Sequence, residues 1–135
     1  MNNMLTGRIQ ALRIAFGLVA TLAGLDKFFN VLADWSSYVS PLAASFLPVS
    51  AAAFMQIVGV VEIAVGLSIL AVAPVAGAYA ASGWLLLVAV NLALGGFLDV
   101  AVRDVVMALA AFTLAGLLSR HGVAPRALPS EQALG

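Results

Sequence analysis

Long apolar stretches separated by isolated polar residues dominate the pattern along the chain. The longest covers residues 49–98 and contains a single charged residue, Glu62. Because a helix needs about 20 apolar residues to cross a hydrocarbon core of about 30 Å, this stretch has the length of two membrane spans. Pro74 is the natural break between them, since proline removes a backbone donor and disfavours helix at the preceding residue. We therefore expect helices over about 49–72 and 75–98.

The first apolar run, residues 14–25, is too short to span a membrane unless the charged residues at its ends are included. With Arg13 at one end and Asp26 and Lys27 at the other, the predicted helix covers about 9–31. Charged residues follow the run directly and no small-residue cleavage site closes it. The pattern therefore argues against a cleavable signal peptide.

The last apolar run, residues 105–119, is also short, and it needs Arg103 and Asp104 to reach the length of a span. The predicted helix covers about 100–119, and the four spans form one transmembrane domain over 1–120. The proline and polar residues beyond them predict a disordered cytoplasmic tail over 121–135.

Composition identifies lipid as the main solvent of this chain. Charged residues make up 9% of it and hydrophobic residues 64%, whereas a soluble domain carries roughly 25% charged residues. The fold class expected is therefore all-α, an integral membrane four-helix bundle in a lipid bilayer. The net charge is zero with no basic stripe, which excludes electrostatic binding of nucleic acid. The absence of cysteine excludes disulfide exchange, thiolate metal sites and covalent c-type haem.

The distribution of Lys and Arg predicts the orientation in the membrane. Arg8, Arg120 and Arg126 lie at the two ends of the chain, whereas Asp34 is the only charge in the loop over residues 30–48. By the positive-inside rule, both termini should face the cytoplasm of a bacterial-type inner (plasma) membrane. The loop also carries residues suited to the aromatic belt at the membrane interface: Trp35, Tyr38 and Phe46.

Six charged residues lie within the predicted spans, where each costs about 2.5–3.5 kcal/mol on insertion scales and usually faces the interior of a bundle. They are accompanied by two polar residues; the set is Arg13, Asp26, Lys27, Glu62, Arg103 and Asp104, with Gln56 and Asn91. At a rise of about 1.5 Å per residue, Glu62 falls near the midplane and most of the others fall near the outer surface. We expect Glu62 to pair with Arg13, beside Gln56, and Asp26 to join the same buried polar set. Three charges are positive and three negative, so mutual neutralisation that only holds the helices together is an equal alternative.

Small residues share faces with these polar residues and predict close helix packing. Gly59 and Gly66 lie on the face of Glu62 in the second span, and Gly17 and Gly24 form a small face on the first. In the last span, the stripe consists of Asp104, Ala108, Ala111 and Ala115.

Recognisable catalytic chemistry is missing from the pattern. His121 is alone at the end of the last span, where a favourable interaction with the helix dipole is its expected role. No paired histidines, closely spaced carboxylates, phosphate-binding glycine loop or Ser-His-Asp set occurs. We therefore expect no autonomous enzyme, no catalytic residue, no metal site and no covalent cofactor.

Several motifs resemble those of the DoxX-like membrane proteins. They are Arg13-Ile-Ala-Phe-Gly17, Gly24-Leu-Asp-Lys27-Phe28, Glu62-Ile-Ala-Val-Gly66-Leu and the pair Arg103-Asp104. The resemblance covers most of the membrane region and implies a four-helix bundle. It also implies a redox-associated or quinone-linked role, as in a small subunit of thiosulfate:quinone oxidoreductase. It carries over five residues as members of a polar interior site: Arg13, Lys27, Glu62, Arg103 and Asp104.

Two classes of function remain open at this point. The first is an accessory subunit of a membrane oxidoreductase that binds a quinone or another lipophilic ligand near the outer leaflet, between the first, third and fourth spans. Its expected ligand-binding residues are Trp84 and Phe28 as walls, Lys27, Asn91 and Arg103 as donors, and Asp104 beside them. The alternative is a small transporter or an assembly factor for another membrane protein, with a homo-oligomeric pore or a packed partner interface.

Overall fold

The computed structural model describes residues 3–122. The tail predicted to be disordered lies almost wholly outside the described residues. Within them the regular structure is entirely helical, and four helices are long and apolar enough to cross a membrane. The all-α four-helix bundle expected from the sequence is confirmed, and the chain has the build of a multi-pass membrane protein.

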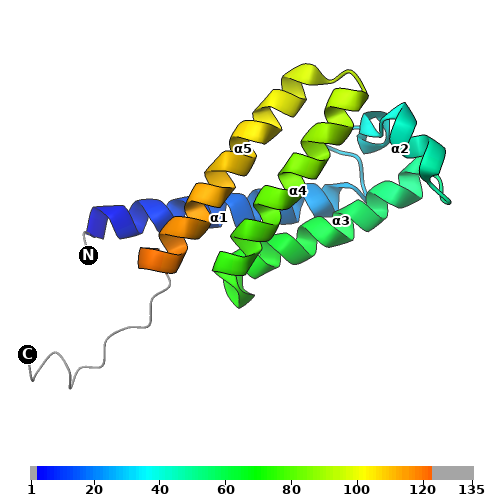
Figure 1. Ribbon diagram of the computed structural model, residues 1–135. Helices are drawn as coiled ribbons and strands as arrows, with labels where there is room; N and C mark the ends of the chain where they lie inside the picture. The colour runs from blue at the N-terminus through cyan, green and yellow to red at the C-terminus, as the bar shows by residue number, and fades with distance from the viewer. Residues whose placement is uncertain (1–2, 123–135) are drawn as a thin grey trace, which may run out of the picture.

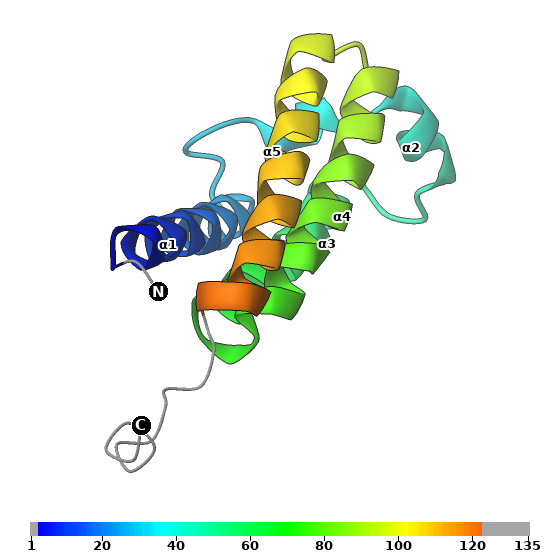
Figure 2. The ribbon, with the colours of Figure 1, turned by 60° about the vertical axis from the view of Figure 1, so that its left-hand side comes forward.

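Two antiparallel helix pairs make up the bundle (Figure 1). One joins α1 (Asn3–Asp26) to α3 (Ala51–Leu67), and the other joins α4 (Pro74–Leu94) to α5 (Leu98–Leu117). The α1/α3 pair crosses the direction of α4 and α5, and α5 begins well away from the end of α1 (Figures 1 and 2). We call the end of the bundle with residues 27–50 the loop end, and the end where α1 begins and α5 finishes the terminal end.

Glycine sets the close contact between α1 and α3. A Cβ atom added at Gly24 would lie 2.6 Å from the carbonyl oxygen of Gly59, and one at Gly66 would lie 2.7 Å from that of Gly17. Both contacts are shorter than real Cβ atoms allow, so only glycine permits this approach. The two glycines on each helix are seven residues apart, which fixes the antiparallel register of the pair.

Alanine plays the same part between α4 and α5. Ala111 and Ala115 are completely buried and Ala108 nearly so, which confirms the small face predicted for the last span. The hydroxyl of Ser82 donates a hydrogen bond of 2.8 Å to the carbonyl oxygen of Ala108 and ties the two helices together. The core between the two pairs lies in the half toward the terminal end: Ile9, Ile69, Ala78, Leu114 and Leu118.

The first helix is displaced from its predicted range of 9–31, because it begins at Asn3 and ends at Asp26. Asp26 causes the early end, since its carboxylate accepts hydrogen bonds from the backbone N–H groups of Val31 and Leu32 at 3.0 and 2.8 Å. Asn30 has a positive φ of 55°, which turns the chain back over the helix end.

The middle helices lie closer to their predicted ranges. Ser50 caps α3 by accepting a hydrogen bond from the N–H of Ala53, and a π-helical turn, Ser68–Val72, continues the helix to its predicted end. Pro74 is the first residue of α4, where its missing N–H costs nothing. The predicted end at 98 is too late, because Gly95 and Gly96, with a φ of 86° at Gly96, break the chain before α5.

The loop between α1 and α3 folds over the loop end of the bundle. It contains a 3₁₀ turn, Trp35–Tyr38, and the short helix α2, Pro41–Phe46. Asn91 of α4 holds it in place, because its amide accepts from the N–H of Ser40 and donates to the carbonyl oxygen of Tyr38, at 2.9 and 2.8 Å. Ser40 is completely buried as a result.

Candidate functional site

An ion pair between Lys27 and Glu62 forms the centre of the site. The Nζ atom of Lys27 lies 2.7 Å from Oε2 of Glu62, with side chains only 5% and 14% exposed. No other ion pair forms within residues 3–122. The expected pairing of Glu62 with Arg13 is therefore wrong, and Lys27 takes the place of Arg13.

The register of α1 against α3 explains this choice. With Gly24 opposite Gly59, Lys27 and Glu62 are separated by six residues along the helix axis, or about 9 Å at 1.5 Å per residue. Helical side chains lean toward the N-terminus of their own helix. Because the helices are antiparallel, the two side chains lean toward each other and close this gap. By the same rule, the side chain of Arg13 is expected to lean away from Glu62, toward the terminal end.

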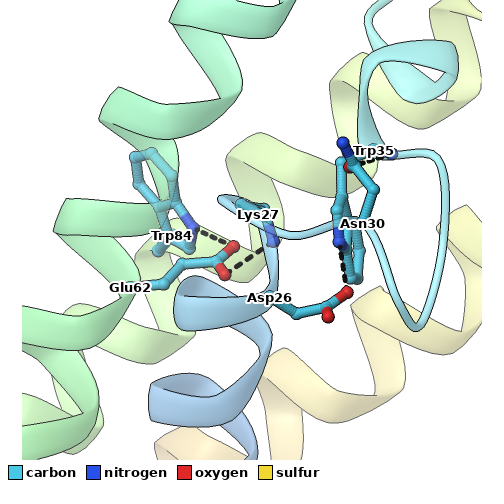
Figure 3. A network of polar contacts seen from close by, with 6 residues as sticks. All are labelled: Asp26, Lys27, Asn30, Trp35, Glu62 and Trp84. Atoms are coloured by element: carbon cyan, nitrogen blue, oxygen red, sulfur yellow. Dashed lines mark hydrogen bonds and ion pairs between the residues drawn. The ribbon is translucent and has the colours of Figure 1, made fainter.

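Two tryptophans flank the ion pair (Figure 3). Trp84 of α4 directs its Nε1 atom at Oε1 of Glu62, at 3.4 Å. On the other side, the ring of Trp35 covers Lys27, with Nζ 3.8 Å from the ring centroid. The indole N–H of Trp35 donates to Oδ2 of Asp26 at 2.9 Å, so the loop is fastened directly over the lysine. Desolvation strengthens such a cation–π contact.

An apolar pocket of about 110 Å³ opens beside Glu62. All four long helices line it, and Glu62 is the only charged residue in the lining. Val19 and Met107 are exposed members of the lining, so the pocket is open toward lipid between α1 and α5. The lining consists of Phe16, Val19, Ala20, Ala23, Glu62, Val65, Ala81, Trp84, Leu85 and Met107.

The expected ligand-binding residues do not gather around this pocket as one layer. Trp84 lines it, and Lys27 reaches it only through Glu62. Asn91 uses its amide to hold the loop backbone. Phe28 lies in the turn after α1 and is exposed, with its ring over Gly59.

The two charged residues at the start of α5 also lie outside the lining. Arg103 is exposed, and Asp104 is half-buried toward the loop end, near enough to Lys27 and Glu62 for their charges to act on it. One turn further along α5, Met107 contributes to the pocket instead.

The expected buried polar set holds only in part. Asp26 is buried. Its carboxylate is satisfied by hydrogen bonds from N–H groups and contacts no cation. Gln56 is exposed, which corrects its expected place beside Glu62: the α3 face that carries Gly59, Glu62 and Gly66 turns inward and leaves Gln56 outside. Arg13 is half-buried, and its Nε atom is buried without a hydrogen-bond acceptor.

Sequence reasoning missed Trp35 and Phe16 as parts of the site. Trp35 was expected in the interfacial belt, and its place over Lys27 depends on how Asp26 turns the loop, which no local pattern reveals. Phe16 follows the spacing of Ile9 and Arg13 on one face of α1, so this periodicity was a usable signal.

The described part of the chain holds no group of three or more His, Asp or Glu side chains that could bind a metal ion. No protein-family model, curated protein or solved structure shows significant similarity to the chain. The chemistry of the pocket therefore has to be argued from its own residues.

Proposed function

We propose that the protein is a DoxX-like accessory subunit of a membrane oxidoreductase, and that it binds the ring of a quinone or a similar lipophilic ligand beside Glu62. The observation that supports this most is the apolar pocket with one charged edge, open toward lipid. Pockets for small molecules are typically apolar with a few polar groups that orient the ligand. The resemblance of the motifs around Arg13, Lys27 and Glu62 to those of DoxX-like proteins supports the proposed family and redox association.

The size of the pocket favours a single ring. A cavity of ~150 Å³ binds benzene, so about 110 Å³ with one open side suits a ring whose tail remains in lipid. Met107 is flexible and partly exposed, so the opening can adjust to the ligand. A lipophile would reach such a pocket from within the bilayer without crossing water.

The polar edge has groups for both oxidation states of a quinone. The indole nitrogen of Trp84 lies 3.4 Å from Oε1 of Glu62, longer than the usual 2.9–3.0 Å, so a ligand carbonyl oxygen could replace this long hydrogen bond as the acceptor. The Glu62 carboxylate can accept from a quinol hydroxyl, while Lys27 balances its charge. Phe16 and Trp84 provide aromatic walls.

The two tryptophans of the chain make a sharp test, because one lines the pocket and the other does not. In Trp35→Phe the tryptophan emission of the protein comes from Trp84 alone, and in Trp84→Phe it comes from Trp35 alone. A short-chain quinone added to these variants in nanodiscs should quench Trp84 saturably and Trp35 only in proportion to its concentration in the lipid. Phenylalanine keeps an aromatic face over Lys27 in the first variant.

Equal, non-saturable quenching in both variants would refute ligand binding at this pocket. Extraction of the purified wild-type protein provides a second measurement. A quinone-like absorbance should co-purify with the wild type and be lost in Ala81→Leu, which fills the pocket from α4.

A further inference from the structure

Arg13 is a charged residue within a membrane span whose partner is not found in the described residues. It is half-buried, its Nε atom is buried without an acceptor, and the only ion pair within residues 3–122 joins two other residues. A guanidinium in hydrocarbon is costly unless an acceptor meets it. The acceptor must therefore come from outside this part of the structure.

The carboxylates of the described residues are distributed unevenly between the two ends of the bundle. Arg8, Arg13 and Arg120, with His121, lie in the half toward the terminal end. Residues 3–25, 63–98 and 105–122 contain no Asp or Glu. All carboxylates of the described chain lie at the midplane or toward the loop end: Asp26, Asp34, Glu62, Asp99 and Asp104. Among residues 3–122, the terminal end therefore has a positive surplus without a counter-ion.

The position of Arg13 allows its guanidinium to reach the level of the lipid headgroups. Arg8 is exposed five residues nearer the start of α1, or about 7.5 Å along the axis. Helical side chains lean toward the N-terminus of their own helix, which for Arg13 is the direction of Arg8. Long basic side chains lay their stems along apolar surface and keep the charged group in a polar layer. Ile9 lies one helical turn before Arg13 along α1. It is 1% exposed and packs against Leu114 and Leu118 of the other helix pair. Arg13 thus lies at the edge of the seam between the two pairs.

We infer that the seam beside Arg13 binds the phosphate of an anionic phospholipid, with the Arg13 guanidinium as its ligand. The planar fork of arginine matches the geometry of a phosphate and binds it by two parallel hydrogen bonds. Basic pockets between membrane helices hold anionic head groups in this way. The unbalanced charge of Arg8 and Arg120 nearby repels the choline or ethanolamine of a zwitterionic lipid and favours a lipid with net negative charge.

Thermal unfolding in nanodiscs tests the site. In phosphatidylcholine with added phosphatidylglycerol, the unfolding midpoint of the full chain should rise above that in phosphatidylcholine alone, since a ligand of the folded state stabilises it. Arg13→Gln should lose most of this shift. In phosphatidylcholine alone the same variant should be at least as stable as the wild type, because it removes an uncompensated charge.

Two matched controls separate a site from general attraction. Arg103→Gln removes an exposed charge at the loop end and should keep the whole shift, whereas Arg8→Gln removes an exposed charge at the same end as Arg13 and should lose a clearly smaller part of the shift than Arg13→Gln. Equal loss in Arg8→Gln and Arg13→Gln would mean diffuse attraction to the membrane surface and would overturn the site. A lower stability of Arg13→Gln in phosphatidylcholine alone would show a protein partner for Arg13 and would also overturn it.

Two further experiments identify the source of the anion that binds Arg13. If inorganic phosphate added to phosphatidylcholine nanodiscs gives the same shift, the ligand is a soluble anion and the lipid proposal is wrong. If phosphatidylglycerol stabilises only Glu131→Gln and not the wild type, a carboxylate of the chain occupies the site and the proposal is also wrong. Phosphatidylglycerol enriched in the lipid bound to the wild type, and not to Arg13→Gln, would support the proposal independently.

Discussion

Lys27 is the residue whose surroundings explain most of the site. Its ammonium group lies between the carboxylate of Glu62 and the ring of Trp35, and the side chain is 5% exposed. The sequence placed Lys27 in the polar interior, but its partner could not be predicted from depth alone. The direction in which each side chain leans, and the register set by Gly24 and Gly59, decided between Lys27 and Arg13.

Breaking the Lys27–Glu62 pair should destabilise the fold more than removing it. Lys27→Met and Glu62→Gln each leave one charge without its partner in low dielectric, so we expect each to lose about 3–5 kcal/mol. The double variant should lose less than the sum of the two, because no lone charge remains. Denaturant titration in detergent measures these free energies of unfolding. Arg103→Met, at an exposed position, should change little, and strictly additive losses would show that the pair has no energetic coupling.

At the scale of elements, the pattern of apolar runs was sufficient for the four spans but not for their ends. Asp26 was counted inside the first span, whereas its carboxylate ends the helix by accepting from the loop backbone. A carboxylate near a helix end can also be solvated, so the role of Asp26 could be recognised only from the path of the loop. The polar residues at the loop end were expected to converge on one ligand, and Asn91 serves the loop itself.

Helix packing in lipid depends on small residues, and two glycines allow a direct comparison. In Gly24→Ala the new methyl group would meet the Gly59 backbone at 2.6 Å, which forces α1 and α3 apart. We expect a marked loss of thermal stability and of the Lys27–Glu62 contact. Gly83→Ala is the control, because open space surrounds Gly83 and alanine favours helix by ~1 kcal/mol. Equal melting of the two variants would contradict the close packing.

On the scale of the whole molecule, the composition and the spacing of apolar runs predicted the fold class correctly. The arrangement of the helices as two crossing pairs could not be predicted, because apolar faces in lipid have no periodic polar side to orient them. The pocket follows from this crossing, since it forms between the pairs beside the core that joins them. Its position therefore depends on tertiary packing rather than on any motif.

The separation of charge between the two ends predicts the orientation of the protein in its membrane. Single cysteines at Asn2, Ser37 and Ser130 of this cysteine-free chain can be labelled with an impermeant maleimide in intact cells. Only Ser37→Cys should react, because the positive terminal end should remain on the cytoplasmic side. Labelling of Asn2→Cys or Ser130→Cys in sealed cells would reverse the assignment.

The cover that Trp35 places over Lys27 has a chemical consequence. Lys27 is the only lysine in the sequence. An acylating reagent in water reaches its amine only when the indole of Trp35 swings aside and releases its hydrogen bond to Asp26. The rate at which Lys27 is acylated therefore reports how readily the loop opens.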